Sequence, residues 1–208
     1  VPLVLGLDEV DLMFQHPAIA TDFFWLAASL ARKVKNEEIW KRLRLVIVHS
    51  KEVYIPLNIN QSPFNVGLPI ELPELTQIQV QDLVRRHELL WSQAQVEQLM
   101  TLVGGHPYLV RQALYQIARG RITLEQLLQV AQTEVGIYGD HLRRHLANLE
   151  EDRELVNVYK QIVVADNPMR IETALAFKLH SMGLVKFQGN EVTPTCNLYR
   201  QYFREWLG

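Results

Sequence analysis

The chain has 208 residues, 48% of them hydrophobic and 21% charged, and a formal net charge of −2. This is an ordinary soluble composition for one large domain or two small ones, and it provides no positive field that would attract nucleic acid or a membrane. The one cysteine, Cys196, excludes a disulfide within the chain, which fits a cytoplasmic protein. No apolar stretch approaches the length of a membrane span, and the first residues do not have the pattern of a signal peptide.

The first predicted element is a strand at residues 3–7, where an apolar run ends abruptly in Asp8 and Glu9. A continuous apolar run is typical of a strand that is covered on both faces, as in a parallel sheet. Ligands of open α/β sheets bind beyond the carboxyl ends of the strands, so the two carboxylates are placed for chemistry. A buried strand that simply ends in an acidic turn is the alternative.

Residues 17–34 are predicted to form a helix, because apolar residues recur there at helical spacing. A short helical turn is expected at 37–43, and a second buried strand at 45–48, which ends in His49 and Ser50. Strand, helix and strand in this order predict a βαβ unit. A buried strand at the start of the chain needs neighbours in its sheet, so the sequence reads like the later part of a larger protein.

The following segment, residues 53–73, is rich in proline and cannot be helical throughout. A short strand is expected within 65–72, and Pro69 favours a position at the edge of the sheet.

Residues 76–150 are predicted to form a bundle of short helices. Thr76, Ser92 and Thr123 are the expected N-caps of three of them. Gln79 and Gln126 stand three residues after the two threonines, which is the spacing of a capping box.

A turn is predicted between two of these helices, at Gly104-Gly105-His106-Pro107. Two glycines allow the backbone to approach a ligand closely, and Pro107 fixes the start of the next helix. A plain corner between two helices is the commoner explanation of such a turn. Arg111 lies one turn into the next helix, where a solvated arginine is the usual case.

Residues 151–208 have the pattern of a winged helix. Its expected elements are a helix at 155–164, one or two helices within 170–182, a hairpin at 184–193 and a closing helix at 197–207. The helices at 170–182 offer only Lys178 and His180 as basic groups near the expected DNA-contacting face. Because DNA binding needs more positive charge facing the phosphates, an intramolecular packing domain is the preferred interpretation.

Two further patterns point to no chemistry. His141 and His145 have the spacing of metal ligands on a helix, but no third ligand is evident and no glutamate completes the motif of a zinc protease. We expect them to be partly exposed helix residues. Cys196 has no partner for thiol catalysis that the sequence reveals.

Together these stretches resemble the downstream part of the AAA-like domain of STAND (signal-transduction) P-loop ATPases, as found in cyanobacterial signalling proteins. The matching stretches are LDEVDL at 7–12, VHS at 48–50, SPFNVGLPIEL at 62–72, GGHPYLV at 104–110 and LHSMGLV at 179–185. The resemblance implies an α/β fold: part of a parallel P-loop sheet, then a helical lid, then a winged helix. The implied domains are 1–75 for the nucleotide-binding core, 76–150 for the lid and 151–208 for the winged helix.

The resemblance also implies roles for individual residues. Asp8 and Glu9 would be the Walker B pair, in which Asp8 holds Mg²⁺ through water and Glu9 polarises the water that attacks the γ-phosphate of ATP. His49 or Ser50 would stand at the position of sensor 1, although a polar strand end that caps a loop is the commoner case. The remaining implied nucleotide-contacting residues are Gly105 and Pro107, beside the adenine, and Arg111 as a sensor-2 arginine.

The chain departs from the family in one respect, because it contains no Gly-Lys dipeptide and therefore no phosphate-binding Walker A loop. We expect an upstream Walker A half of the same protein as its partner, alongside effector or sensor domains, and no tight binding of ATP or Mg²⁺ by this chain alone. The function predicted is that of a fragment of an ATP-dependent switch. The alternative is a nucleotide-free module that contacts protein or DNA through an ATPase-derived scaffold.

Overall fold

The structure is a computed structural model of the chain, and it describes residues 2–10, 13, 16–33, 42–48, 68, 70 and 72–208. The chain divides into two compact units, Val1–Leu72 and Pro73–Gly208. The division predicted from the sequence, into 1–75, 76–150 and 151–208, is a finer one and stays a prediction.

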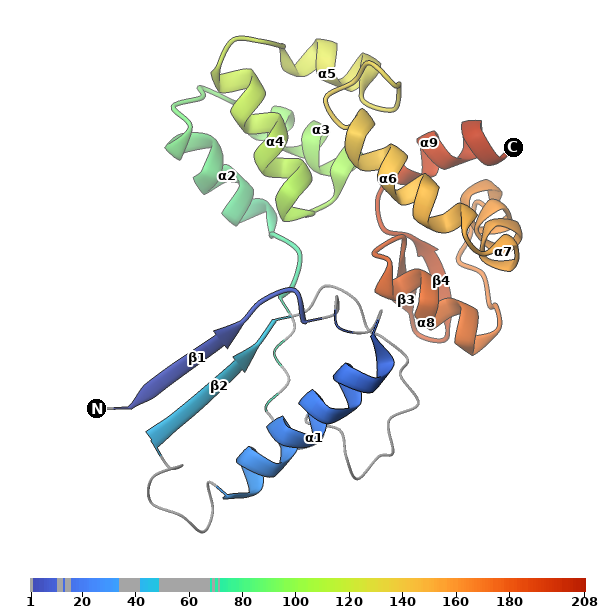
Figure 1. The fold of residues 1–208 in the computed structure, drawn as a ribbon. Helices are drawn as coiled ribbons and strands as arrows, with labels where there is room; N and C mark the ends of the chain where they lie inside the picture. Colours follow the sequence, from blue (N-terminus) through green and yellow to red (C-terminus); the bar gives the residue numbers. More distant parts are fainter. Residues whose placement is uncertain are drawn as a thin grey trace. The chain divides into compact units, whose positions relative to one another are not determined.

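The described part of the first unit is a βαβ arrangement of β1 (Leu3–Leu7), α1 (Pro17–Lys33) and β2 (Leu43–Ile47) (Figure 1). The two strands pair in parallel, with Leu3 opposite Leu43 and Leu7 opposite Ile47. The predicted strand, helix and strand are therefore confirmed, with the second strand beginning at Leu43 rather than at residue 45. A parallel pair needs a crossover between its strands, and α1 lies within that connection.

The prediction that the first strand is covered on both faces is wrong for the described residues. Leu3 and Val4 point to opposite faces of the sheet, yet they are 66% and 63% exposed. The physical reason is that few elements are present to cover the strand. The described sheet has two strands, and α1 is the one described helix that connects them. The small core of this unit forms around Val10 and Ala20 at the other end of β1.

Two predicted elements of this unit fall largely on residues outside the described part. In the helical turn expected at 37–43, the described residues are Arg42 and Leu43, and Leu43 already belongs to β2. In the strand expected within 65–72, the described positions are 68, 70 and 72, and none of them is in a strand.

The second unit begins with five helices, which confirm the helical bundle expected after residue 76. They are α2 (Gln77–Arg86), α3 (Gln93–Val103), α4 (Pro107–Ala118), α5 (Leu124–Val130) and α6 (Gly139–Glu150). Thr76, Ser92 and Thr123 are the N-caps of α2, α3 and α5, each within a complete capping box. A capping box satisfies backbone N–H groups that the first turn of a helix leaves without partners, which explains why these helices begin where the sequence predicts.

The remainder of the second unit combines three helices with a hairpin. Its elements are α7 (Arg153–Val164), α8 (Thr173–Ser181), β3 (Val185–Gln188), β4 (Glu191–Pro194) and α9 (Asn197–Leu207) (Figure 1). β3 and β4 are antiparallel, and Met169 forms an isolated antiparallel bridge with Val192. None of the helices in the described part of the chain is long and apolar enough to cross a membrane.

One hydrophobic core extends through the whole second unit, and α9 is its closing element. Tyr199, Tyr202 and Phe203 on α9 are fully buried, and α9 contacts α3, α6 and α7. Buried tyrosine hydroxyls have partners: Tyr138 donates to the carbonyl of Leu109. Because leaving such a hydroxyl unpaired would cost about 1–3 kcal/mol, these bonds fix how distant segments pack.

Candidate functional site

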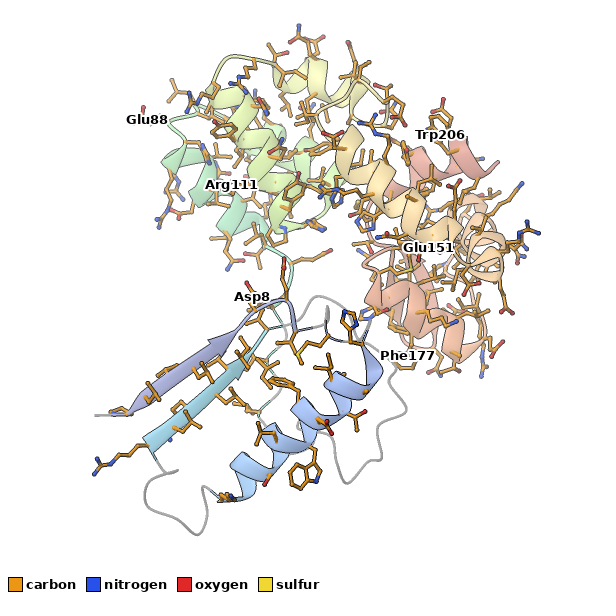
Figure 2. The ribbon with its side chains drawn as sticks, in the orientation of Figure 1. Asp8, Glu88, Arg111, Glu151, Phe177 and Trp206 are labelled. Carbon is orange, nitrogen blue, oxygen red and sulfur yellow. The ribbon has the colours of Figure 1, made fainter. Side chains whose placement is uncertain are left out.

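An acidic loop stands at the carboxyl end of β1. The N–H of Val48 donates to the carbonyl of Leu7 at 2.8 Å, and the N–H of Val10 donates to the carbonyl of Val48 at 3.2 Å. Asp8 and Glu9 lie between these two anchored positions, so they leave the strand as a short, exposed loop whose first residue is labelled in Figure 2. The sequence prediction that two carboxylates mark the end of this strand is therefore confirmed in its geometry.

The conformation of the acidic loop differs for its two residues. Glu9 has φ 52°, which is the left-handed region that a non-glycine residue adopts at some cost. Its N–H donates to Oδ1 of Asp8 at 2.9 Å, so one carboxylate oxygen of Asp8 orders the loop. The left-handed turn at Glu9 could not be expected from the sequence pattern.

The donor chemistry of this loop fits Mg²⁺. Magnesium is bound in nucleotide sites by one or two carboxylates together with waters and phosphate oxygens, and not by a closed cage of protein ligands. Asp8 and Glu9 offer exposed carboxylates of this kind. Among the described residues no group of three or more histidine, cysteine, aspartate or glutamate side chains is arranged to hold a metal. His49 and Ser50, the two sensor-1 candidates, lie outside the described residues.

A second group of predicted residues belongs to the turn between α3 and α4. Gly104 ends α3 with φ 61° and ψ −146°, a conformation that is strained for any residue with a side chain. Gly105 is glycine for a different reason: a Cβ placed there would lie 2.1 Å from the carbonyl oxygen of Leu75. The carbonyl of Gly105 also accepts a hydrogen bond from the N–H of Leu75 at 2.8 Å. The turn is therefore in close backbone contact with the segment that leads into α2, whereas the predicted approach to a ligand stays a prediction.

Pro107 and Arg111 lie on α4, directly after this turn. Pro107 is the first residue of the helix, and His106 stands at the N-cap without a capping side-chain hydrogen bond. Proline suits this position because the first N–H of a helix has no intrahelical partner. Arg111 is exposed, is labelled in Figure 2, and forms no hydrogen bond or ion pair with another described residue. Its guanidinium is accessible. This exposure is expected both for an arginine that contacts a ligand and for an ordinary surface arginine, so it does not distinguish the two.

The structure groups the predicted residues within the two units. Asp8 and Glu9 are together in Val1–Leu72, and Gly105, Pro107 and Arg111 are together in Pro73–Gly208.

A family model described as the AAA-like domain matches residues 1–205. The chain belongs to the AAA-like domain family. Among solved structures, a Walker-type ATPase of Pyrococcus abyssi superposes with a TM-score of 0.65 over 98% of this chain at 13% identity. At that identity the likeness concerns the fold, which is mixed α/β, mostly helical, with a small parallel sheet similar to that of a P-loop ATPase. The chain corresponds to 63% of the length of that ATPase chain. A comparison with curated proteins finds no match.

Sequence reasoning missed the contacts that join the start of α9 to the glycine turn of this AAA-like domain. Asn197, the first residue of α9, donates through Nδ2 to the carbonyl of Thr101 in the last turn of α3 at 2.9 Å. A Cβ at Gly104 would lie 3.8 Å from Cβ of Cys196. Burial raises the pKa of the Cys196 thiol to about 12, which disfavours the reactive thiolate.

The two histidines at metal-ligand spacing are partly exposed helix residues, as predicted. Their Nε2 atoms, at 2.7 Å for His141 and 3.4 Å for His145, lie within hydrogen-bond distance of the hydroxyl of buried Tyr199. Arg143, their neighbour on α6, instead forms ion pairs with Asp140 and Glu134. No signal in the local sequence pairs these histidines with a tyrosine 54 to 58 residues away.

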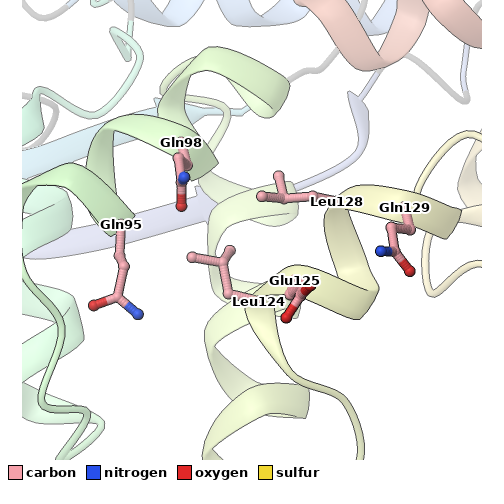
Figure 3. A pocket seen from close by; sticks show the side chains of 6 residues that line it. All are labelled: Gln95, Gln98, Leu124, Glu125, Leu128 and Gln129. Atoms are coloured by element: carbon pink, nitrogen blue, oxygen red, sulfur yellow. The ribbon is translucent and has the colours of Figure 1, made fainter.

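A shallow hollow of about 500 Å³ lies between α3 and α5 of the AAA-like domain (Figure 3). Its lining residues are Gln95, Gln98, Leu124, Glu125, Leu128 and Gln129. It includes neither the glycine turn nor Arg111, and its lining carries no positive charge that would attract phosphate.

Proposed function

We propose that this AAA-like chain is the downstream part of a STAND-type ATP-dependent switch. The observation that carries the proposal is the position of Asp8 and Glu9, which form an exposed loop at the carboxyl end of a parallel strand paired with β2. Phosphoryl transfer needs an anionic ligand for Mg²⁺ and a group that orients water, and this is the edge of an α/β sheet at which both are found. Membership of the AAA-like family supports the same assignment.

In this proposal Asp8 would hold Mg²⁺ through water, and Glu9 would polarise the water that attacks the γ-phosphate. His49 or Ser50, which follow β2 in the sequence, contact the γ-phosphate or that water. When bound, Mg²⁺ neutralises negative charge on the phosphates of ATP. In the same proposal Gly105 and Pro107 would lie beside the adenine, and Arg111 would act as a sensor-2 arginine.

The phosphate-binding loop is proposed to come from an upstream half of the same protein. The exposed apolar side chains of β1 support this, because a strand whose residues on both faces are apolar is expected to be covered. The crossover helices that accompany additional parallel strands would cover Leu3, Val4 and Leu5, which are exposed here by 66%, 63% and 46%. The corresponding Gly-Lys sequence does not occur among the 208 residues.

The second unit is proposed to combine a lid with a winged helix that transmits the nucleotide state to effector or sensor domains. The order of α7, α8, the β3–β4 hairpin and α9 supports the winged helix, as does the bridge between Met169 and Val192. Lys178 on α8 is paired with Asp152 at 3.3 Å, which reduces the free positive charge of that helix. The proposed role of this part is therefore intramolecular and not DNA binding.

The test uses a longer polypeptide that includes the upstream phosphate loop. Asp8→Ala should weaken binding of Mg-ATP, because the ion loses its anionic anchor. Glu9→Gln keeps the size of the side chain but removes its charge, so binding should persist while turnover falls about a hundredfold or more. Asp22→Asn is the matched control, since Asp22 is an exposed acidic residue on α1 of the same unit and should leave both quantities unchanged.

Affinity is measured by calorimetry and turnover by phosphate release. Hydrolysis by the Glu9→Gln variant at the parental rate would show that Glu9 is not the catalytic carboxylate. Normal Mg-ATP affinity in the Asp8→Ala variant as well would overturn the Walker B assignment. Failure of the longer parental polypeptide to bind nucleotide would favour the alternative, a nucleotide-free interaction module.

A further inference from the structure

Three histidines and two tyrosines meet where the glycine turn, α6 and α9 come together in the second unit. His106 stands at the start of α4, and its ring centroid lies 5.8 Å from that of His141 on α6 and 6.5 Å from that of Tyr199 on α9. The rings of His141 and His145 are 4.5 Å apart, and Tyr108 stacks on His141 at 5.1 Å. We call these five residues the histidine cluster.

The hydroxyl of Tyr199 bridges two imidazoles and limits how many of them can carry a positive charge. It lies 2.7 Å from Nε2 of His141 and 3.4 Å from Nε2 of His145, and Tyr199 is fully buried. A hydroxyl donates one hydrogen bond, so one ring must present a bare nitrogen to it. If both rings are protonated, both Nε2 atoms become donors and the hydroxyl proton has no acceptor within the cluster.

We propose that the histidine cluster is an acid-sensitive latch, which holds the glycine turn and α6 against α9 when its imidazoles are neutral and releases them when they are protonated. The reason is geometric, since two imidazolium ions 4.5 Å apart would repel each other around a buried hydroxyl. α9 is the element that an opened latch would free first, because its first two turns carry Tyr199 and the bond from Asn197 to Thr101. The latch operates within the second unit and does not require bound nucleotide.

The charges around the cluster mostly oppose protonation. The titratable and charged groups that face it are Arg144 on α6, Tyr108 on α4, Tyr199 and Cys196 at the start of α9, and Glu74 before α2. Arg144 repels a positive charge on His141, whereas Glu74 attracts one on His106. The one acidic group among those named, Glu74, attracts a proton at His106.

The electrostatics give the pH range in which the latch should open. Burial, followed by the neighbouring His145, His106 and Arg144, lowers the pKa of His141 to about 3 from its ordinary 6.5. Burial also lowers the pKa of His106. A histidine whose folded pKa is lowered stabilises the closed form fully above pH 6.5, and this stabilisation is lost as the pH falls toward the folded pKa.

Hydrogen–deuterium exchange of the full chain tests the latch at pH 7.5 and pH 5.0, after correction for the intrinsic exchange rates. His141 has its ordinary pKa of 6.5 in the open form and a pKa of about 3 in the closed form. The open population of residues 104–110 and 196–200 should therefore rise about thirtyfold on acidification. In the His141→Gln, His145→Gln double variant, which retains hydrogen-bonding groups at these two positions but cannot be protonated there, the rise should be clearly smaller than in the parental chain. His87→Gln is the matched control, because His87 ends α2 and should leave the parental response intact.

Unchanged protection of the parental segments between the two pH values would overturn the proposal, as would an equal rise in the double variant. A measurement on the parental chain alone covers the case in which the variant does not fold. In an imidazole NMR titration, His141 should remain neutral at pH 5.0, whereas a midpoint near 6.5 for His141 would also overturn the latch.

Discussion

Replacement of Gly105 by alanine should destabilise the second unit more than replacement of any glycine in open space. The added Cβ would stand 2.1 Å from the oxygen and 2.8 Å from the nitrogen of Leu75, both of which are backbone atoms and cannot rotate away. Separating the two segments breaks the bond from the N–H of Leu75 to the carbonyl of Gly105, worth about 1 kcal/mol. Over-packing of a tight contact costs a further 1–3 kcal/mol or so, which gives a loss of about 2–4 kcal/mol in the free energy of unfolding.

Urea unfolding followed by circular dichroism at 222 nm measures this loss, because helices dominate the second unit. Gly120→Ala is the matched control: Gly120 has φ 66°, but no atom lies within 4 Å of an added Cβ. In that variant the free energy of unfolding should fall only by the cost of placing alanine in the left-handed conformation, about 1 kcal/mol. If Gly105→Ala proves no less stable than Gly120→Ala, the steric account of the turn is wrong.

Three further outcomes are expected from the chain alone. Calorimetric titration with Mg-ATP should show no micromolar binding, because the 208 residues contain no Gly-Lys phosphate loop, and a micromolar affinity would contradict this. Binding of duplex DNA in a mobility-shift assay should be weak and lost with added salt, since Lys178 is paired with Asp152; nanomolar, sequence-dependent binding at physiological salt would show that α8 is misassigned. Cys196 should react with iodoacetamide at pH 8 about a thousandfold more slowly in the folded chain than in urea, because its pKa is raised to about 12 and the thiolate is the nucleophile. Equal rates in the two states would refute the burial of the thiol.

Helix positions in the second unit were predictable because the signals that set them are local. Thr76 with Gln79, and Thr123 with Gln126, satisfy the first backbone donors of their own helices within three residues. The closing helix was predicted at the bounds observed, 197–207, since its apolar residues recur at helical spacing. Such signals need no information about the rest of the chain.

The environment of the first strand could not be predicted in the same way. An apolar run predicts that a strand will be buried, but burial depends on elements elsewhere in the molecule. Leu3 and Val4 are exposed because the described sheet offers two strands and one helix to cover them. The acidic loop was predictable as a position at the end of β1, whereas the left-handed backbone at Glu9 depends on its bond to Asp8 and on the anchored residues on either side.

The two glycines of the α3–α4 turn show how a local motif acquires a long-range role. Gly104 adopts the positive φ that ends α3, and Gly105 has no Cβ that would collide with the backbone of Leu75. The same dipeptide therefore ends a helix and allows a second segment to pack closely against the turn. The carbonyl of Thr101, one turn earlier, is held by Asn197 at the start of α9. Segments near residues 75, 104 and 197 therefore meet at one turn. A displacement of that turn has to move the start of α2 or of α9, since the contact with Leu75 leaves no free space and the bond to Asn197 is direct. A ligand that contacted the turn would thus act on α9 through backbone and side-chain contacts already present in the fold, which is the mechanical requirement for a switch.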